Sequence, residues 1–538
     1  MGIPSYFSYI VKNHKQIIKK YIKSSMKVQN LYMDCNSIIY DVVKQINFNE
    51  IVGKENDIII DAVIHKIDEY ITSISPDKNI IIAFDGVAPI AKLEQQRNRR
   101  YKSWYQNEIN KKIFKQTTID PWNTTAITPG TLFMKELNEY IQTYYHNNAK
   151  YTGINIIIST SNDFGEGEHK IFEYIRNNPA SHLNDTTIIY GLDADLIMLS
   201  INHLPICPNI YLFRETPEFI KSIDNSLEPN ESYIMDIPVL TQIITLDMNN
   251  GNILTTEQQN DRIYDYIFLC FFLGNDFMPH FPAVNIRTGG IDKLLNAYKE
   301  TIGGTKENLT DGKKIIWKNV RKLVTFLANN EENMFKTEAK FRDRNEKKYY
   351  PTNTPEEKYK KFDAIPTHDR AIEKYINPFK ENWQFRYYKS LFKMDNDEER
   401  IKQISLNYLE GLEWTMKYYT TGCPNWRWSY NYNYPPLLQD LIRHIPYFNT
   451  ELIPLIPPSP VIPLVQLCYV LPRPSLQLLP SPIYTALKKY HSDWYPVDCE
   501  FVWSYCRYFW EAHVELPFLD INEVETFVKD IMNKNPRK

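Results

Sequence analysis

Residues 186–195 read Thr-Thr-Ile-Ile-Tyr-Gly-Leu-Asp-Ala-Asp, a short apolar run that leads directly into two carboxylates. Isoleucine, threonine and tyrosine are enriched in strands. A continuous apolar run of this length is typical of a strand buried on both faces of a sheet. The same order of apolar run and acid occurs in residues 31–34, 79–85 and 154–168. These four runs predict a largely parallel sheet whose strands lead into carboxylates.

Helical segments separate the predicted strands. Residues 169–176 and the stretch after Pro89 carry apolar side chains at helical spacing. Alternation of strands with helices predicts an α/β layered domain. We expect this first domain to occupy residues 1–300.

Two regions of different composition follow. Residues 301–405 are dense in charge, and we predict a mostly helical insertion or linker beside the core. Residues 406–538 are rich in aromatic residues and proline, and nine prolines between Pro454 and Pro482 exclude a long helix or a central strand there. Aromatic residues alternate along residues 426–434, which is typical of a packed strand face. The alternative is that one or two of these rings form a platform for nucleic-acid bases.

Length and composition set further limits. A chain of 538 residues is too long for one compact core, and 43% hydrophobic residues exclude a mainly disordered protein. We expect neither a signal peptide nor a membrane span, because the first residues lack an apolar segment and the densest apolar stretch, residues 264–273, is too short to cross a bilayer. Seven scattered cysteines without a C-x-x-C pair favour a reducing compartment, so we expect a cytoplasmic protein.

The carboxylates that follow the strands indicate a metal site. Ligand crevices of open α/β sheets lie at the carboxyl ends of the strands, so these acids should converge. A fifth acidic site follows the apolar run that ends at Leu273. In both acidic pairs a small residue, Gly167 or Ala194, leaves room for two acids to face one centre. The acids are Asp34, Asp85, Glu166, Glu168, Asp193, Asp195 and Asp276.

Seven carboxylates in one place require counter-charge. Oxygen ligands without a cluster of Cys or His favour Mg²⁺ or Mn²⁺ over Zn²⁺. Two such ions ~3.5–4 Å apart would activate a water and stabilise the leaving oxygen of a phosphodiester. His169 adjoins Glu168, but a lone histidine is more often structural, and we assign it no catalytic role.

A cationic helix is predicted after Asp85. The net charge of −3 says nothing in favour of a nucleic-acid partner, but residues 86–119 contain eight basic residues against two acidic ones. The side chains Lys92, Gln96, Arg99 and Arg100 lie at positions i, i+4, i+7 and i+8 and therefore share one helix face. Such a face beside the metals could hold a terminal phosphate, as an exonuclease requires. A solvated helix face is the alternative.

These motifs resemble those of the Xrn family of 5′→3′ exoribonucleases over nearly the whole chain. The strings that carry the resemblance are residues 1–4 (MGIP), 31–40 (LYMDCNSIIY), 85–100 (DGVAPIAKLEQQRNRR), 127–134 (ITPGTLFM), 165–170 (GEGEHK), 190–198 (YGLDADLIM) and 272–280 (FLGNDFMPH). Residues 411–414 (GLEW), 426–428 (WRW), 470–472 (VLP) and 516–520 (LPFLD) resemble the second homologous region of the family.

The resemblance implies that the seven acids bind two Mg²⁺ ions, which Mn²⁺ can replace, and that Lys92, Gln96, Arg99 and Arg100 hold a 5′-phosphate. It implies a PIN/FEN-like α/β nuclease domain with a helical tower that starts from the basic helix. Residues 406–538 would wrap this domain and close the active site, which restricts it to single strands with free ends. The implied activity is processive hydrolysis of single-stranded RNA with a 5′-monophosphate to nucleoside monophosphates, in RNA decay after decapping. We expect a monomer.

The chain departs from the family pattern at several places. Tyr40 stands where the family has a histidine that stacks on the 5′ base. We predict that Tyr40 and Trp428 close the two ends of a short base stack, with packing of Tyr40 into the core as the alternative. A zinc knuckle and a basic tail, typical of the nuclear branch, are missing, which favours the cytoplasmic branch. We also expect the protein to lack the further carboxyl-terminal domains of cytoplasmic members.

Two other functions compete with this interpretation. A flap-type, structure-specific DNA nuclease uses the same acidic arrangement but would lack the phosphate-binding helix and the long second region. A catalytically silent RNA-binding protein would have lost metal ligands, whereas all seven positions are acidic.

Overall fold

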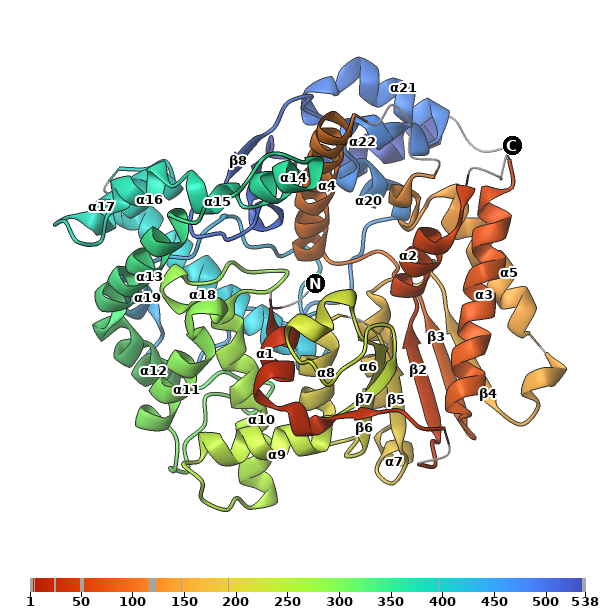
Figure 1. Ribbon diagram of the computed structural model, residues 1–538, viewed down its shortest axis with the longest axis horizontal. Coiled ribbons are helices and arrows are strands. Elements are labelled where there is room, and N and C mark those ends of the chain that lie inside the picture. The colour runs from red at the N-terminus through yellow and green to blue at the C-terminus, as the bar shows by residue number, and fades with distance from the viewer. Residues whose placement is uncertain are drawn as a thin grey trace.

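The computed structural model describes residues 3, 5–23, 26–48, 53–115, 122–146, 148–191, 193–395 and 397–534 (Figure 1). Met1, Gly2 and Pro4 of the amino-terminal motif, Leu192, and residues 116–119 of the basic segment lie outside these ranges. A seven-stranded sheet has the order β1-β7-β6-β5-β2-β3-β4, and only β7 runs antiparallel to its neighbours. The strands are β1 (Ile18–Lys20), β2 (Asn30–Asp34), β3 (Asn79–Ala83), β4 (Asn155–Ser159), β5 (Thr187–Tyr190), β6 (Ile210–Glu215) and β7 (Ser232–Asp236).

The structure confirms the predicted α/β class with a mostly parallel sheet. The four predicted strands are β2, β3, β4 and β5, with limits that differ by one residue. β1, β6 and β7 extend the sheet on one side beyond these four strands.

Apolar side chains of the central strands alternate between two cores. Leu31 and Met33 of β2 face one core, and Tyr32 faces the other. Because both faces of the sheet are covered, the strands read as continuous apolar runs. The first core includes α2 (Asn36–Gln45), α3 (Glu55–Ile74) and α5 (Leu132–Tyr145). The second includes α1 (Tyr6–Asn13), α6 (Gly167–Asn177), α8 (Asp195–His203), α9 (Ile237–Met248) and α10 (Thr256–Cys270), while α7 (Pro179–His182) is a short turn of helix after α6.

A group of helices lies away from the sheet, and some of its members continue the second core whereas others form a separate core (Figure 1, green to cyan). Its members are α11 (Gly290–Thr301), α12 (Trp317–Asn329), α13 (Glu331–Glu346), α14 (Pro355–Asp363), α15 (Ile365–His368), α16 (Ala371–Ile376), α17 (Trp383–Leu391) and α18 (Glu398–Thr420). The domain limits at residues 300 and 405 stay a prediction. Among the described residues, no helix is long and apolar enough to cross a membrane.

The carboxyl-terminal part contains short helices and a small two-stranded sheet. These elements are α19 (Leu438–His444), α20 (Pro463–Val470), α21 (Ser481–Tyr490), α22 (Ile521–Lys534), β8 (Glu500–Val502) and β9 (His513–Glu515). Within the proline-rich stretch α20 is only eight residues long; Pro463 occupies its tolerated first position, and Pro472 follows just after its end.

The alternating aromatic residues 426–434 are not a strand, which corrects the prediction of a strand face. They form an irregular segment whose rings are nevertheless buried, including Trp426, Trp428 and Tyr434. Packing rather than strand pairing explains the aromatic pattern, because the segment has no partner strand along the part of the chain described here.

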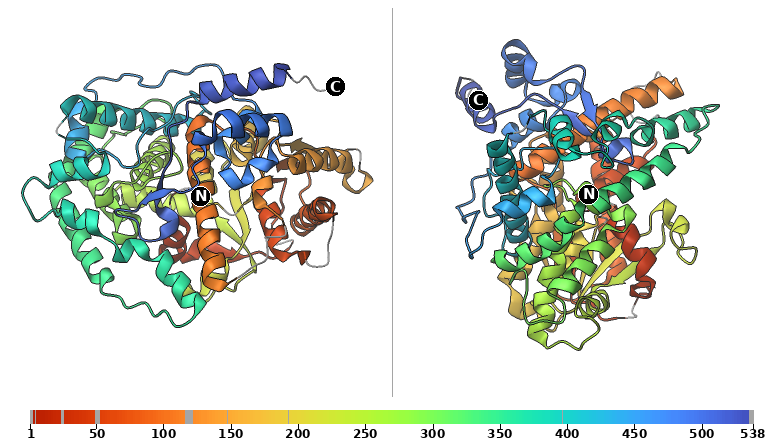
Figure 2. Two further views of the ribbon diagram at one scale, coloured as in Figure 1. Left: turned by 90° about the horizontal axis from the view of Figure 1, so that it is seen from above. Right: turned by 90° about the vertical axis from the view of Figure 1, so that its left-hand side faces the viewer.

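The basic helix α4 (Ile90–Phe114) runs from the edge of the sheet into the carboxyl-terminal part (Figures 1 and 2). It packs against α20 and α14. The guanidinium of Arg97 donates to the carbonyl of Pro517 at 3.0 Å, and the backbone N–H of Ile90 donates to the carbonyl of Trp426 at 3.0 Å. The carboxyl-terminal part is therefore bonded to both the start and the second turn of α4.

Candidate active site

The predicted acids converge at the carboxyl ends of the central strands, where the order of strands along the sheet reverses. Strands β5, β2, β3 and β4 are adjacent and parallel, so their carboxyl ends meet at one edge. The chain order reverses between β2 and β5, the position at which open α/β sheets bind ligands. Asp34 is the last residue of β2, and the acids that follow β3, β4 and β5 lie next to it.

The carboxylate of Asp34 is buried in a tight space. Its Oδ1 atom has no hydrogen-bond partner among the described residues. A Cβ atom on Gly167 would lie 2.6 Å from this oxygen, so the small residue between Glu166 and Glu168 makes room for the Asp34 carboxylate. Burial and the nearby Asp85 carboxylate raise the pKa of Asp34. A buried carboxylate oxygen without a donor fits a site that binds a cation.

Asp85 is held by two donors. Its Oδ2 accepts from Asn36 Nδ2 at 2.8 Å, and its Oδ1 accepts from the backbone N–H of Gly167 at 2.7 Å. Asn36 in turn accepts from the backbone N–H of Asp85 at 3.0 Å. These bonds connect the start of α2, the end of β3 and the start of α6, and they fix the plane of the carboxylate.

The first acidic pair lies at the start of α6. Ligand atoms of Glu166, Glu168 and His169 lie within 4.8 Å of one another, and all three residues are buried. Burial and the Glu166 carboxylate raise the pKa of Glu168. Burial lowers the pKa of His169, whose ring stacks on Tyr418 with centroids 3.8 Å apart. The sequence interpretation gave His169 no role, and the structure places it beside two predicted ligands.

The second acidic pair lies at the start of α8. Asp195 is the first residue of the helix and is buried, whereas Asp193 precedes the helix and is exposed. Burial raises the pKa of Asp195 to about 6. Its Oδ1 accepts a hydrogen bond from Tyr419 at 3.0 Å.

Asp276 does not follow a strand, which corrects the fifth of the predicted strand-end sites. The apolar run before it forms α10 and a 3₁₀ turn (Phe271–Leu273), and Gly274 then takes a positive φ of 80°. The side chain of Asn275 accepts from the backbone N–H groups of Phe277 and Met278 at 2.9 and 3.0 Å and so fixes the loop.

The ammonium of Lys92 bridges two of the acids. Its Nζ atom lies 2.7 Å from Asp276 Oδ2 and also forms an ion pair with Glu166 Oε2. Burial alone would raise the pKa of Asp276, but the Lys92 charge holds it below its usual range. Lys92 therefore supplies a counter-charge within the carboxylate cluster, in the position of a cation among oxygen ligands.

All seven carboxylates belong to one electrostatic cluster. Asp34 interacts with Asp85, Asp193 and Glu166, and Asp195 interacts with Asp193 and Asp276. Glu168 interacts with members of both groups. An all-oxygen set with an orphaned Asp34 oxygen and repelling charges fits hard divalent cations.

The four predicted phosphate-binding residues lie on α4 in different environments. Lys92 faces the acids, Gln96 is buried with its Oε1 atom unpartnered among the described residues, and Arg99 is half-buried. The Nη2 atom of Arg100 donates to Thr128 Oγ1 at 2.6 Å, and burial lowers the pKa of Arg100 to about 10.

The two predicted stacking residues pack in different cores. Tyr40 is half-buried on α2 and interacts electrostatically with Arg100. Trp428 is 7% exposed, and its ring stacks on Trp414 with centroids 5.3 Å apart and an angle of 25°. One face of Trp428 is therefore covered by protein. A base stack between Tyr40 and Trp428 stays a prediction.

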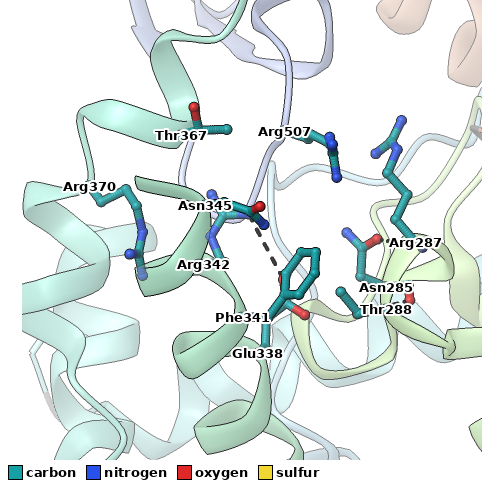
Figure 3. A pocket seen from close by; sticks show the side chains of 10 residues that line it. All are labelled: Asn285, Arg287, Thr288, Glu338, Phe341, Arg342, Asn345, Thr367, Arg370 and Arg507. Atoms are coloured by element: carbon teal, nitrogen blue, oxygen red, sulfur yellow. Dashed lines mark hydrogen bonds and ion pairs between the residues drawn. The ribbon is translucent and has the colours of Figure 1, made fainter. Parts of the chain in front are cut away.

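A cavity elsewhere is rich in arginine but includes none of the predicted site residues (Figure 3). Three of its arginines already form ion pairs: Arg342 and Arg370 both pair with Glu373, at 2.7 and 2.6 Å, and Arg287 pairs with Glu511 at 2.5 Å. The carboxylate cluster, where charge is unbalanced, is the better candidate for a catalytic centre.

Comparison with known proteins agrees with this location. A family profile described as "XRN 5′-3′ exonuclease N-terminus" matches residues 1–216, which contain six of the seven acids and the start of α4. A second profile, "Xrn1 helical domain", matches residues 257–374 and 352–535. Together the two profiles cover most of the chain.

Several curated relatives are similar over almost the whole chain. The 5′-3′ exoribonuclease 2 homolog of Drosophila melanogaster is 26% identical over 97% of this chain and 70% of its own length. The 5′-3′ exoribonuclease 2 of Arabidopsis thaliana is 26% identical, over 97% of this chain and 66% of its own length. The 5′-3′ exoribonuclease 1 of Saccharomyces cerevisiae is 27% identical, over 97% of this chain and 42% of its own length.

Among solved structures, the catalytic core of Rad2 in complex with DNA substrate aligns with 82% of this chain and 99% of that chain, at 12% identity and a TM-score of 0.33. This score is too low to compare the folds. The two family profiles, together with the carboxylate cluster at the switch point of the sheet, identify the chain as a member of the Xrn family of 5′-3′ exonucleases.

Proposed function

We propose that the chain, a 5′→3′ exoribonuclease by its family, degrades single-stranded RNA with a 5′-monophosphate to nucleoside monophosphates, using two Mg²⁺ ions. The observation that carries this proposal is the cluster of seven carboxylates, with an orphaned oxygen on Asp34, beside the cationic face of α4. Mn²⁺ can replace Mg²⁺ at such a site because both prefer oxygen ligands.

The carboxylates are arranged to hold the metals and orient a phosphodiester. Mg²⁺ bound by the seven acids would supply an activated water and stabilise the leaving oxygen. Asp85 is held rigidly by Asn36 and by the backbone of Gly167, so its ligand oxygens are preorganised. A divalent cation held by these acids would supply the counter-charge that Lys92 supplies to Glu166 and Asp276, and the Lys92 ammonium would then be free to donate to a substrate phosphate.

Two of the predicted phosphate-binding side chains support a preference for one terminal phosphate. Gln96 is buried, and half-buried Arg100 donates to Thr128, so a site formed by them would be rigid and small. The buried Nε atom of Arg100 has no partner among the described residues, which supports a role for this guanidinium in binding a phosphate oxygen.

Closure by the carboxyl-terminal part supports a preference for single strands with free ends. The bond from Ile90 to Trp426 and the bond from Arg97 to Pro517 tie this part to the helix that holds the phosphate. A pocket enclosed in this way would exclude a duplex or a branched strand. A channel that encloses the substrate also favours processive degradation.

Several further properties belong to this proposal. We place the enzyme in the cytoplasm, in RNA decay after decapping, and as a monomer; the seven free cysteines support a reducing compartment. A flap-type DNA nuclease is not favoured, because the relatives named above are exoribonucleases.

One assay tests the proposal directly. The protein is incubated with 5′-monophosphate RNA, 5′-triphosphate RNA and flap DNA, with Mg²⁺ or with EDTA, and the products are resolved on a gel. We expect mononucleotides from the monophosphate RNA only, and only with Mg²⁺. Internal cleavage of flap DNA, or equal degradation of triphosphate RNA, would contradict the proposal.

A further inference from the structure

Two neighbouring tyrosines of α18 donate hydrogen bonds to two of the carboxylates. The hydroxyl of Tyr418 donates to Glu166 Oε1 at 2.8 Å, and the hydroxyl of Tyr419 donates to Asp195 Oδ1 at 3.0 Å. These partners are 252 and 224 positions apart in the sequence. The carboxyl-terminal half of the chain therefore contacts one member of each acidic pair.

Each hydroxyl engages only one oxygen of its carboxylate. The other oxygen of Glu166, Oε2, faces the Lys92 ammonium inside the cluster. Both hydroxyls act as donors, because an ionised carboxylate oxygen can only accept a hydrogen bond. A donor on one oxygen fixes the rotation of the carboxylate and directs the other oxygen toward the centre of the cluster.

The rings of the two tyrosines are themselves locked by aromatic packing. Tyr418 stacks on His169 at 3.8 Å and packs on Trp414 at 4.8 Å. Tyr419 meets the ring of Phe271 at 5.5 Å and the edge of His169 at 5.9 Å. Because both rings are almost fully buried, neither hydroxyl can be replaced by water without moving α18.

We infer that Tyr418 and Tyr419 are positioning residues, which orient Glu166 and Asp195 for metal binding and couple metal affinity to the docking of α18. This inference rests on the proposed two-metal function. Groups that hydrogen-bond to metal ligands typically change metal affinity 10–100-fold when they are removed. His169, stacked on Tyr418, keeps the first of these rings in place.

The first test measures metal binding without RNA. Tyr418→Phe and Tyr419→Phe keep the rings and remove only the hydroxyls. The matched control is Tyr430→Phe, because the hydroxyl of Tyr430 is also buried and donates to the carbonyl of Tyr434 at 2.7 Å. Mn²⁺ affinity is measured by calorimetry or by electron paramagnetic resonance, and thermal unfolding in EDTA checks the fold.

We expect Tyr418→Phe and Tyr419→Phe to weaken Mn²⁺ binding about 10–100-fold and Tyr430→Phe to leave it within two-fold. Activity of the first two variants should recover at higher Mg²⁺ concentration, which a general packing defect would not produce. Folded variants that bind Mn²⁺ as the wild type does would overturn the inference. Wild-type protein that binds no Mn²⁺ would instead contradict the proposed metal site.

A second measurement uses the wild-type protein and does not depend on the folding of any variant. Coupling between metal and α18 is reciprocal, so metal binding must stabilise the docked helix. Mn²⁺ should slow amide hydrogen exchange in peptides that cover residues 409–420 and leave peptides from α22 unchanged. Unchanged exchange in residues 409–420, under conditions where Mn²⁺ binds, would overturn the inference as well.

Discussion

Replacement of Gly167 by alanine tests whether the position of the Asp34 carboxylate controls activity. A Cβ atom at position 167 would lie 2.6 Å from Asp34 Oδ1, and 3.4 Å is an ordinary contact, so the carboxylate must retreat by about 0.8 Å. A displacement of roughly 1 Å in a reacting constellation can cost about 100-fold in rate. Gly167 begins α6 without a positive φ, so alanine is compatible with the backbone conformation at this position.

We therefore expect Gly167→Ala to lose roughly 100-fold in kcat/KM on 5′-monophosphate RNA while its Tm stays close to that of the wild type. The matched control is Gly191→Ala, whose Cβ would meet the flexible Cδ1 end of Leu196 and remain 3.7 Å from Asp34 Cβ. The control should keep most activity at some cost in stability. A folded Gly167→Ala protein with wild-type kcat/KM would refute the reasoning.

Asp195→Asn should abolish hydrolysis without unfolding the protein, and a near-normal rate with Mg²⁺, measured on labelled RNA, would exclude it as a ligand. Arg99→Ala with Arg100→Ala should erase the preference for monophosphate over triphosphate ends; competition between the two RNAs measures it, and a retained preference counts against the pocket. Tyr40→Ala should slow degradation about ten-fold, because base stacking contributes ~1–3 kcal/mol, while Tyr40→Phe keeps the rate; full activity of Tyr40→Ala leaves only the packing role. Glu331→Ala should lower the free energy of unfolding by about 2–4 kcal/mol in denaturant titrations, because it strands two backbone donors at the start of α19. Burial raises the pKa of Glu331 to about 8, so the wild type should lose stability relative to Glu331→Gln as pH rises from about 4.5 through 8, and parallel curves would contradict this.

The sheet was predictable wherever strands are buried on both faces. β3 reads Asn79-Ile-Ile-Ile-Ala83, and such a run has few alternatives to a central strand. β6 begins with the similar run Ile210-Tyr-Leu-Phe213, so the signal was present, although no acidic pair follows it. β1 contains Lys19 and Lys20 at the edge of the sheet, and its three residues carry no apolar pattern.

Short apolar runs do not distinguish a strand from a buried helix, and this explains the error at Asp276. Residues 264–273 form the end of α10 and a 3₁₀ turn. Nearly all of them are buried, so their apolar side chains do not show the spacing of a half-exposed helix. The aromatic segment at residues 426–434 shows that an alternating pattern does not by itself identify a strand. The aromatic residues stand at every second position, and most of their rings are buried although no neighbouring strand is present along the described residues.

The convergence of the acids could be predicted from the sequence, but the hydrogen bonds that other parts of the chain donate to them could not. Asp34 and Gly167 belong to local motifs whose spacing is visible in the sequence. The donors of Tyr418 and Tyr419 come from more than 200 positions away, and no periodicity reports a contact of that kind. Such contacts depend on the docking of whole helices, which is decided by tertiary packing.

The active site is therefore completed by two parts of the chain that meet on α4 and on the acids. Removing residues 406–538 would delete the Tyr418 donor at one end of the site and break the Ile90 bond to Trp426 at the other. It would also uncover the apolar core between α4 and α20. A buried carboxylate that loses its donor is less stable and less well oriented. We therefore expect residues 1–300 alone to keep the sheet but not the full geometry of the proposed metal ligands. We therefore expect catalytic competence in this protein to depend on the helices around the site as well as on the acids themselves.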